Sequence, residues 1–149
     1  MRTSPTTAPS IFPSRNAKTT ASSSNWISRT SASGWGRVAS LAAVDEIASD
    51  PYWERGASED WVREKYRETA NKLVEVASRY GKSVQMWIKA YQIEAGREND
   101  LAIAVAESRS AGIKNIFAWS YRGTEILSWL KSDNPDKVEE VYHKALQNY

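Results

Sequence analysis

The chain has 149 residues, enough for one domain with a single core and too few for two comfortable ones. Its 20 basic and 18 acidic residues leave a net charge of +2, which gives no overall attraction to nucleic acid or to a membrane surface. The lack of cysteine excludes disulfides and thiolate metal sites, and a single histidine excludes histidine-rich zinc clusters, so we expect no metal or other cofactor. No segment approaches the ~18 consecutive apolar residues of a membrane-spanning helix. We therefore expect a soluble, cytoplasmic protein.

The first part of the chain differs in composition from the rest. Residues 1–34 are rich in Ser, Thr, Ala, Pro and Asn, and all 18 carboxylates lie from Asp45 onward. A segment with so few large aliphatic residues cannot bury enough apolar area to offset its conformational entropy. We expect residues 1–34 to be a disordered or non-native leader ahead of a domain at 35–149. An organellar transit peptide, or a misplaced start or frameshift upstream of the coding region, would account for the same composition.

The first predicted strand and helix follow from local signals. A short apolar run that ends in residues 44–47 indicates a strand, and Pro51 ends regular structure after it. Ser58 can then cap a helix whose first turn is acidic, a charge that suits the positive end of the helix dipole. Apolar residues recur at helical spacing from Trp61 to Tyr80, and Gly81 suits a left-handed stop. We expect this to be the strongest helix in the chain.

The second predicted strand, residues 84–91, has two different faces. Side chains point to opposite faces at successive positions of a strand, so Met86, Ile88 and Ala90 share an apolar face. The other face mixes aromatic, amide and ammonium groups from Gln85, Trp87, Lys89 and Tyr91.

The remaining predicted elements continue the alternation. A helix is expected at about 100–111, ended by Gly112, and a third strand at 115–119. Thr124 can cap a short helix through Leu130, and the pair Asn134-Pro135 indicates the start of a last helix.

Strands that alternate with helices at a spacing of about 30 to 40 residues favour an α/β fold with parallel strands joined by helical crossovers. In such sheets the ligand site lies at the carboxyl ends of the strands. The three carboxyl-end loops, SDPYWERG, AYQIEAGRE and WSYRGTE, each combine aromatic and charged residues, whereas the amino-end turns YGKS and AGIKN are short and plain. This asymmetry predicts a binding site at the carboxyl-end loops.

Three segments, DEIASDPYW, QMWIKAYQ and IFAWSYRG, resemble the ends of strands six, seven and eight of a (β/α)8 (TIM) barrel of the glycoside hydrolase type. The resemblance covers roughly residues 37–149. Its most specific element is Trp119 followed by Ser120, because in many retaining barrel glycosidases a tryptophan there floors the sugar subsite and precedes a non-proline cis peptide. The resemblance implies a truncated, partial barrel that binds carbohydrate or another small polar ligand and is catalytically incompetent alone.

A closed barrel needs about 250 residues, so three parallel units leave two open sheet edges, a hazard for self-association. A retaining glycosidase also needs two carboxyl groups about 5 Å apart. In the glycosidase clan that these segments resemble, the two carboxyl groups come from the ends of strands four and seven. This chain carries Tyr91-Gln92 at the position of the strand-seven glutamate. Asp50, directly after the first strand, and Glu94 are the candidate catalytic carboxylates. Asp50 could instead make a turn hydrogen bond ahead of Pro51.

The candidate ligand-binding residues gather at the same loops, where aromatic planes could stack on sugar rings. They are Tyr52, Trp53, Trp87, Lys89, Tyr91, Gln92, Trp119, Tyr121 and Arg122. Lys89 could bind an anion, form a Schiff base as in an aldolase-type lyase, or pair with a buried carboxylate. Arg122 could clamp a carboxylate or phosphate, or pair with Glu125.

Other aromatic and titratable residues are expected to be structural. Trp61 and Trp129 should pack on helices, and His143 should lie on a helix surface. A nonenzymatic module that binds a ligand or a partner remains an alternative function. Nucleic-acid binding is not supported, because five of the 20 basic residues precede Asp45 and only 15 remain against 18 acidic ones.

Overall fold

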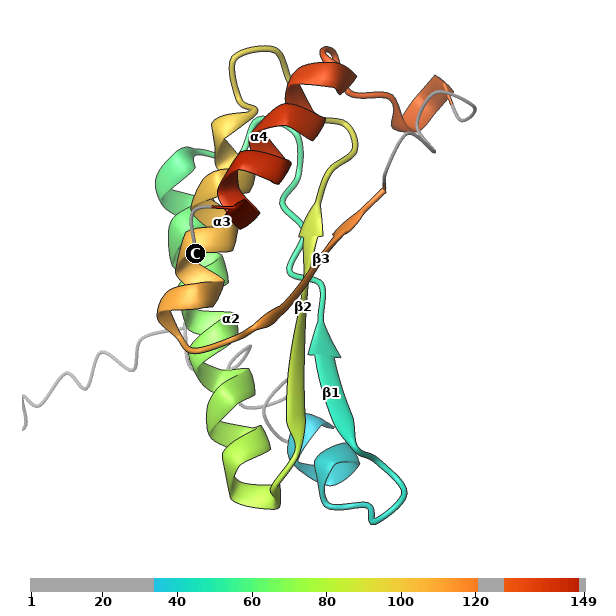
Figure 1. The fold of residues 1–149 in the computed structure, drawn as a ribbon, viewed down its shortest axis with the longest axis vertical. Coiled ribbons are helices and arrows are strands. Elements are labelled where there is room, and N and C mark those ends of the chain that lie inside the picture. The colour runs from blue at the N-terminus through green and yellow to red at the C-terminus, as the bar shows by residue number, and fades with distance from the viewer. Residues whose placement is uncertain (1–33, 121–127, 148–149) are drawn as a thin grey trace, which may run out of the picture.

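The computed structural model describes residues 34–120 and 128–147. Strands and helices alternate along these residues, after a short helix at 34–39 (Figure 1). None of the described helices is long and apolar enough to span a membrane. The later elements are β1 (Glu46–Ser49), α2 (Glu59–Tyr80), β2 (Ser83–Lys89), α3 (Asn99–Ser110), β3 (Asn115–Trp119), the 3-10 helix η1 (Ser128–Leu130) and α4 (Pro135–Gln147).

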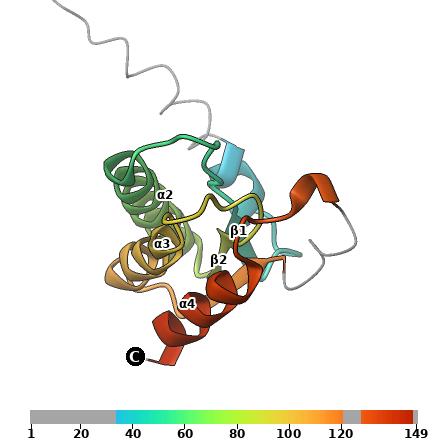
Figure 2. The same ribbon diagram turned by 90° about the horizontal axis from the view of Figure 1, so that it is seen from above.

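The three described strands form one parallel sheet in the order β1-β2-β3. Ile47 lies opposite Val84, and Met86 lies opposite Ile116. The predicted parallel α/β arrangement is therefore confirmed, and the carboxyl ends of all three strands lie at the same edge of the sheet. Figure 2 shows α2, α3 and α4 arranged along one side of the strands.

Helix α2 begins and ends where its sequence signals predict. The Ser58 hydroxyl accepts a hydrogen bond from the Trp61 backbone N–H (3.1 Å), which satisfies one of the free donors of the first turn. Gly81 adopts the left-handed conformation (φ 65°) and closes the last turn. Val62 and Leu73 on the inner face are fully buried. The expectation that Trp61 is a packing residue is wrong, because the residue is 44% exposed.

Strand ends differ in part from the prediction. Strand β1 ends at Ser49, directly before Asp50 as predicted, but it begins only at Glu46, because Val44 is still part of a turn in which its N–H donates to the Leu41 carbonyl (3.2 Å). Strand β2 ends at Lys89 instead of Tyr91, although the Ala90 N–H still donates to the Trp119 carbonyl (2.8 Å).

The remaining predicted elements are mostly confirmed. Helix α3 begins and ends one residue earlier than predicted, and β3 has the predicted bounds. Helix α4 begins at Pro135, and the Val138 N–H donates to the Asn134 carbonyl (3.1 Å). The predicted helix at 124–130 lies largely outside the described residues, and its last three positions form η1. The leader expected at 1–34 also lies outside them, except for Gly34.

The core fills the space between the helices and one face of the sheet. Strand side chains of one parity point into it, and helix side chains meet them from the other side. The contributing residues include Ile47, Met86, Ile88, Ile116, Leu73, Leu101, Val105 and Val138. Side chains of the other parity lie on the opposite face of the sheet, and α2, α3 and α4 do not lie along it (Figure 2). We call this second face the open face; it consists of Glu46, Ala48, Gln85, Trp87, Lys89, Asn115, Phe117 and Trp119.

Candidate functional site at the carboxyl ends of the strands

The amino-end part of the open face is a polar ladder. The Asn115 side-chain amide donates to a Glu46 carboxylate oxygen (2.9 Å) across β2. With the Gln85 amide oriented to suit both neighbours, its nitrogen donates to Glu46 (3.2 Å) and its oxygen accepts from the Trp87 indole (3.3 Å). The ladder fixes the side chains of all three strands at this end of the sheet.

The middle of the open face is aromatic. Trp87 and Phe117 stack with ring centroids 5.4 Å apart and an interplanar angle of 28°. Phe117 is 47% exposed, and Ala48 beside them is also exposed. Trp87, a predicted sugar-stacking residue, is therefore half-buried within the sheet face and is engaged by its neighbour.

Three aromatic rings form a chain at the carboxyl ends of the strands. The Tyr52 ring meets the Tyr91 ring edge to face (5.5 Å, 87°), and Tyr91 meets Trp119 in the same way (5.2 Å, 83°). Trp119 remains 41% exposed. We call Tyr52, Tyr91 and Trp119 the aromatic rim.

Asp50 lies next to the aromatic rim and is exposed. Burial, together with the negative charge of Asp50, raises the pKa of Tyr52 to about 12, and the same two causes raise the pKa of Tyr91. Both phenols are therefore neutral hydrogen-bond donors at neutral pH. The rim combines two hydroxyl donors, one carboxylate acceptor and an exposed indole.

Lys89 lies beneath the rim with only 2% of its surface exposed. Its ammonium donates to the Trp53 carbonyl (2.7 Å) and lies 5.5 Å and 5.1 Å from the ring centroids of Trp53 and Tyr91. No described carboxylate lies within ion-pair distance of the Lys89 ammonium. Among the described residues, the predicted alternative that Lys89 pairs with a buried carboxylate is therefore not found. Burial lowers the pKa of Lys89, and the charge of Glu94 opposes this shift.

Trp53 lies inside the domain, away from the rim surface. Its ring packs edge to face against Tyr66 (5.9 Å, 72°), and Tyr66 donates to the Trp87 carbonyl (3.3 Å). Because Trp53 is buried, no face of its ring is open to a ligand, and its carbonyl serves to hold Lys89.

Glu94 joins two carboxyl-end loops. One of its oxygens pairs with Arg55 (3.3 Å), and the other accepts from the Gly56 backbone N–H (2.9 Å). Arg55 also pairs with Asp133 (3.2 Å), which accepts from the Ala95 N–H (3.0 Å). Both oxygens of the predicted catalytic Glu94 are thus engaged in holding the loops together.

Gln92 makes a second connection between loops. Its side-chain amide donates to the Trp129 carbonyl (2.9 Å), and its backbone N–H donates to the Leu130 carbonyl (2.9 Å). Gln92 adopts a left-handed backbone (φ 50°), and these two bonds hold it there. Trp129 itself is 69% exposed, so the expectation that it is a packing residue is wrong.

The peptide bond between Trp119 and Ser120 is cis, as the sequence resemblance predicted. Tyr121 and Arg122, two further predicted binding residues, lie outside the described residues. His143 is exposed, as expected, and its Nε2 lies 3.6 Å from a Glu139 carboxylate oxygen one turn earlier on α4.

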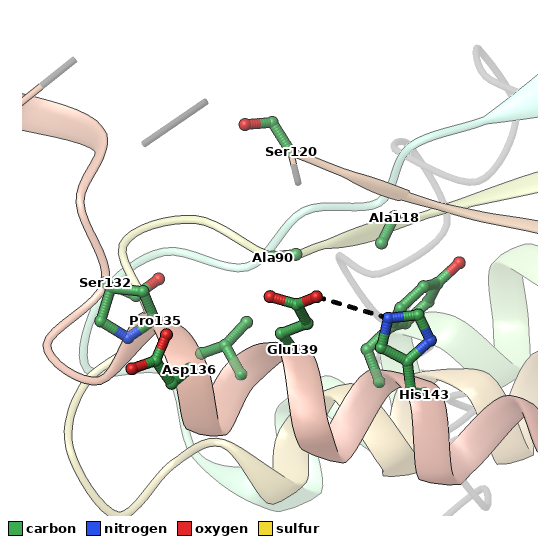
Figure 3. A pocket seen from close by; sticks show the side chains of 10 residues that line it. Ala90, Ala118, Ser120, Ser132, Pro135, Asp136, Glu139 and His143 are labelled. Atoms are coloured by element: carbon green, nitrogen blue, oxygen red, sulfur yellow. Dashed lines mark ion pairs between the residues drawn. The ribbon is translucent and has the colours of Figure 1, made fainter. Parts of the chain in front are cut away.

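A cavity of about 80 Å³ that the sequence did not predict lies between α4 and the helix-facing side of β2 and β3. Figure 3 shows Ala90, Ala118 and Ser120 on one wall and the Glu139–His143 pair on the other. Sites for small molecules usually have about 300 Å³ or more. The cavity is therefore too small for a sugar. A wider, open hollow of about 680 Å³ adjoins the rim at Tyr52 and is also lined by Arg55 and Trp61, so the rim remains the candidate site.

Among the described residues, no group of three or more His, Asp and Glu side chains is placed to hold a metal ion. Comparison of the chain with protein-family models, with curated proteins and with solved structures gives no match. The function must therefore be argued from the site itself.

Proposed function

We propose that residues 46–147 form three consecutive units of a (β/α)8-type barrel and that the aromatic rim binds carbohydrate without cleaving it. Support for the barrel comes from the parallel strand order and from helices gathered on one face of the sheet, which leave the other face in the position of a barrel interior. The observation that carries the proposed ligand class is the edge-to-face chain of Tyr52, Tyr91 and Trp119 beside the exposed Asp50.

This combination of groups suits a sugar. Each pyranose ring has an apolar C–H face, which packs on an indole, and a margin of hydroxyls, which need donors and acceptors. Trp119 supplies an exposed indole, the two rim tyrosines supply neutral hydroxyls, and Asp50 supplies a carboxylate. The rim lies where ligands of parallel α/β sheets bind.

The proposal excludes hydrolysis because of how Glu94 is used. A glycosidase needs one carboxyl group free to donate a proton and a second free to act on the sugar or on water. Glu94 is fully engaged by Arg55 and by the Gly56 N–H, so it cannot supply such a group without breaking the link between the loops. Asp50 alone can orient a ligand but cannot make a carboxyl pair.

The test is a titration of the full chain with cellohexaose, xylohexaose and mannohexaose, followed by tryptophan fluorescence and by calorimetry. Trp119 is 41% exposed, which leaves about 100 Å² of a side chain of roughly 250 Å² open. A sugar that covers about half of this area gains about 1.3 kcal/mol, so Trp119→Ala should weaken binding about tenfold.

Tyr80→Ala is the matched control, because Tyr80 is 39% exposed and is the last residue of α2, at the amino ends of the strands and away from the rim. We expect it to bind like the unaltered protein. No saturable binding of any of the three sugars, or equal weakening by both substitutions, would show that the rim is not a carbohydrate site.

A second candidate function rests on the buried ammonium of Lys89. An amine with a lowered pKa and no ion-pair partner among the described carboxylates can lose its proton and attack a carbonyl carbon; loss of water then gives an imine. Incubation with glyceraldehyde and borohydride, followed by peptide mass spectrometry, should place the reduced adduct on Lys89, and Lys89→Arg should remove it. Adducts confined to exposed lysines would end this candidate.

A further inference from the structure

We propose that copies of this chain associate head to tail, with β3 of one copy lying parallel to β1 of the next. The inference does not depend on the carbohydrate proposal. Within the described residues, β1 and β3 each pair only with β2, so each presents one side without a strand neighbour. Parallel sheets are normally covered on both faces, and unpaired edges readily accept another strand.

The open face adds apolar surface to these two edges. Phe117 and Trp119 of β3 are 47% and 41% exposed, and Ala48 of β1 is exposed. If the amino ends of β3 and of the incoming β1 are aligned, Phe117 lies beside Ala48 and Trp119 lies beside Asp50. A large ring then meets a small side chain, and the apolar surface extends across the junction.

Charges at the amino ends of the two edges are complementary. Asp45 directly precedes β1, and Lys114 directly precedes β3; both are exposed. Neither has an ion-pair partner among the described residues. Asp45 has the parity of Ile47, and Lys114 has that of Ile116, so both belong to the helix-covered side of the sheet. In the aligned parallel pairing they become direct neighbours.

The same charges disfavour symmetric pairing of two β1 edges. Two β1 edges related by a twofold axis would run antiparallel, which would place Asp45 and Glu46 of one copy beside Asp50 of the other. Such contacts between like charges oppose association. A head-to-tail contact instead brings an acidic β1 edge to a β3 edge that begins with a lysine.

The test is sedimentation velocity of the full chain from low to high micromolar concentration. We expect mass to increase with concentration and the increase to weaken at high salt. Asp45→Lys and Lys114→Glu should each weaken association about tenfold, because either one converts an attraction into a repulsion. The double variant, in which the pair is reversed, should associate like the unaltered protein.

Glu68→Lys is the matched control, because Glu68 is an exposed acid on α2, away from both edges. It should leave association unchanged, and circular dichroism should show the same fold for every variant. Two results would overturn the proposal. One is a monomer at every concentration, and the other is stronger association of Asp45→Lys, which would indicate a symmetric β1 contact.

Discussion

Replacing Lys89 by methionine tests how the domain accommodates a buried ammonium. Methionine keeps an unbranched side chain that is one atom shorter, and it removes the ammonium with its charge and its hydrogen bond to the Trp53 carbonyl (2.7 Å). Loss of a hydrogen bond from a charged donor costs about 1.5–3 kcal/mol, and loss of the two ring contacts about 1 kcal/mol. These losses are offset because folding of the variant no longer buries a charged group, which costs several kcal/mol in the unaltered protein. At pH 7 we expect its free energy of unfolding to lie within about 1 kcal/mol of the unaltered value.

The direction in which the stability difference changes with pH is better defined than its size at pH 7. Burial lowers the pKa of Lys89 in the folded protein below its unfolded value of about 10.4. Between these two pKa values the unfolded chain binds more protons than the folded one, so the unaltered protein gains stability as pH rises. The variant lacks this gain. Raised pKa values of Tyr52, Tyr66 and Tyr91 act in the opposite direction, but they are present in both proteins and cancel in the difference.

The assay is urea unfolding of both proteins at several pH values from 7 to 10.5, followed by far-UV circular dichroism. The stability of Lys89→Met relative to the unaltered protein should fall steadily as pH rises. Lys144→Met, which removes an exposed ammonium from α4, controls for the general loss of one positive charge. A stability difference that stays constant across this range, or that changes in favour of the variant, would refute the inference that the buried ammonium is destabilised.

Two further predictions concern the helix start at Ser58 and the buried carboxylate of Glu98. Ser58→Ala should reduce the free energy of unfolding by about 1 kcal/mol, measured by urea unfolding, because the Trp61 N–H loses its acceptor; an unchanged midpoint would contradict this role. Hydrogen bonding from Asn134, against the opposing effect of burial, lowers the pKa of Glu98. Its contribution to stability is therefore complete above pH ~4.3 and is lost as pH falls through the lower folded value, so Glu98→Gln should flatten the acid side of the stability profile. An equally steep acid side in the variant would assign the pH dependence to other groups.

The parts of the fold that sequence could predict are those fixed by local chemistry. Ser58 and Gly81 bound α2 because a capping hydroxyl and a left-handed glycine act within one turn of the helix. The two faces of β2 follow from strict alternation, which the sheet preserves from Gln85 to Lys89. The parallel order follows because the intervening segments are long enough for helical crossovers.

The parts that sequence could not predict depend on contacts between distant residues. Lys89 is buried because the loop that contains Trp53 folds over it, and its partner is a backbone carbonyl, which no side-chain pattern reveals. Glu94 was a candidate catalytic carboxylate on the loop after the second strand, but it is engaged by Arg55, 39 residues earlier in the chain. Trp61 and Trp129 were expected to be packing residues because they lie on helices, yet they are 44% and 69% exposed.

The bonds that Arg55 and Gln92 make bear on how much conformational entropy the loops would lose when a ligand binds. They tie together three loops, near residues 55, 93 and 131, that are far apart in sequence. Loops anchored in this way lose little further conformational freedom when a molecule settles on them. The rim is therefore preorganised: folding sets its shape before any ligand binds.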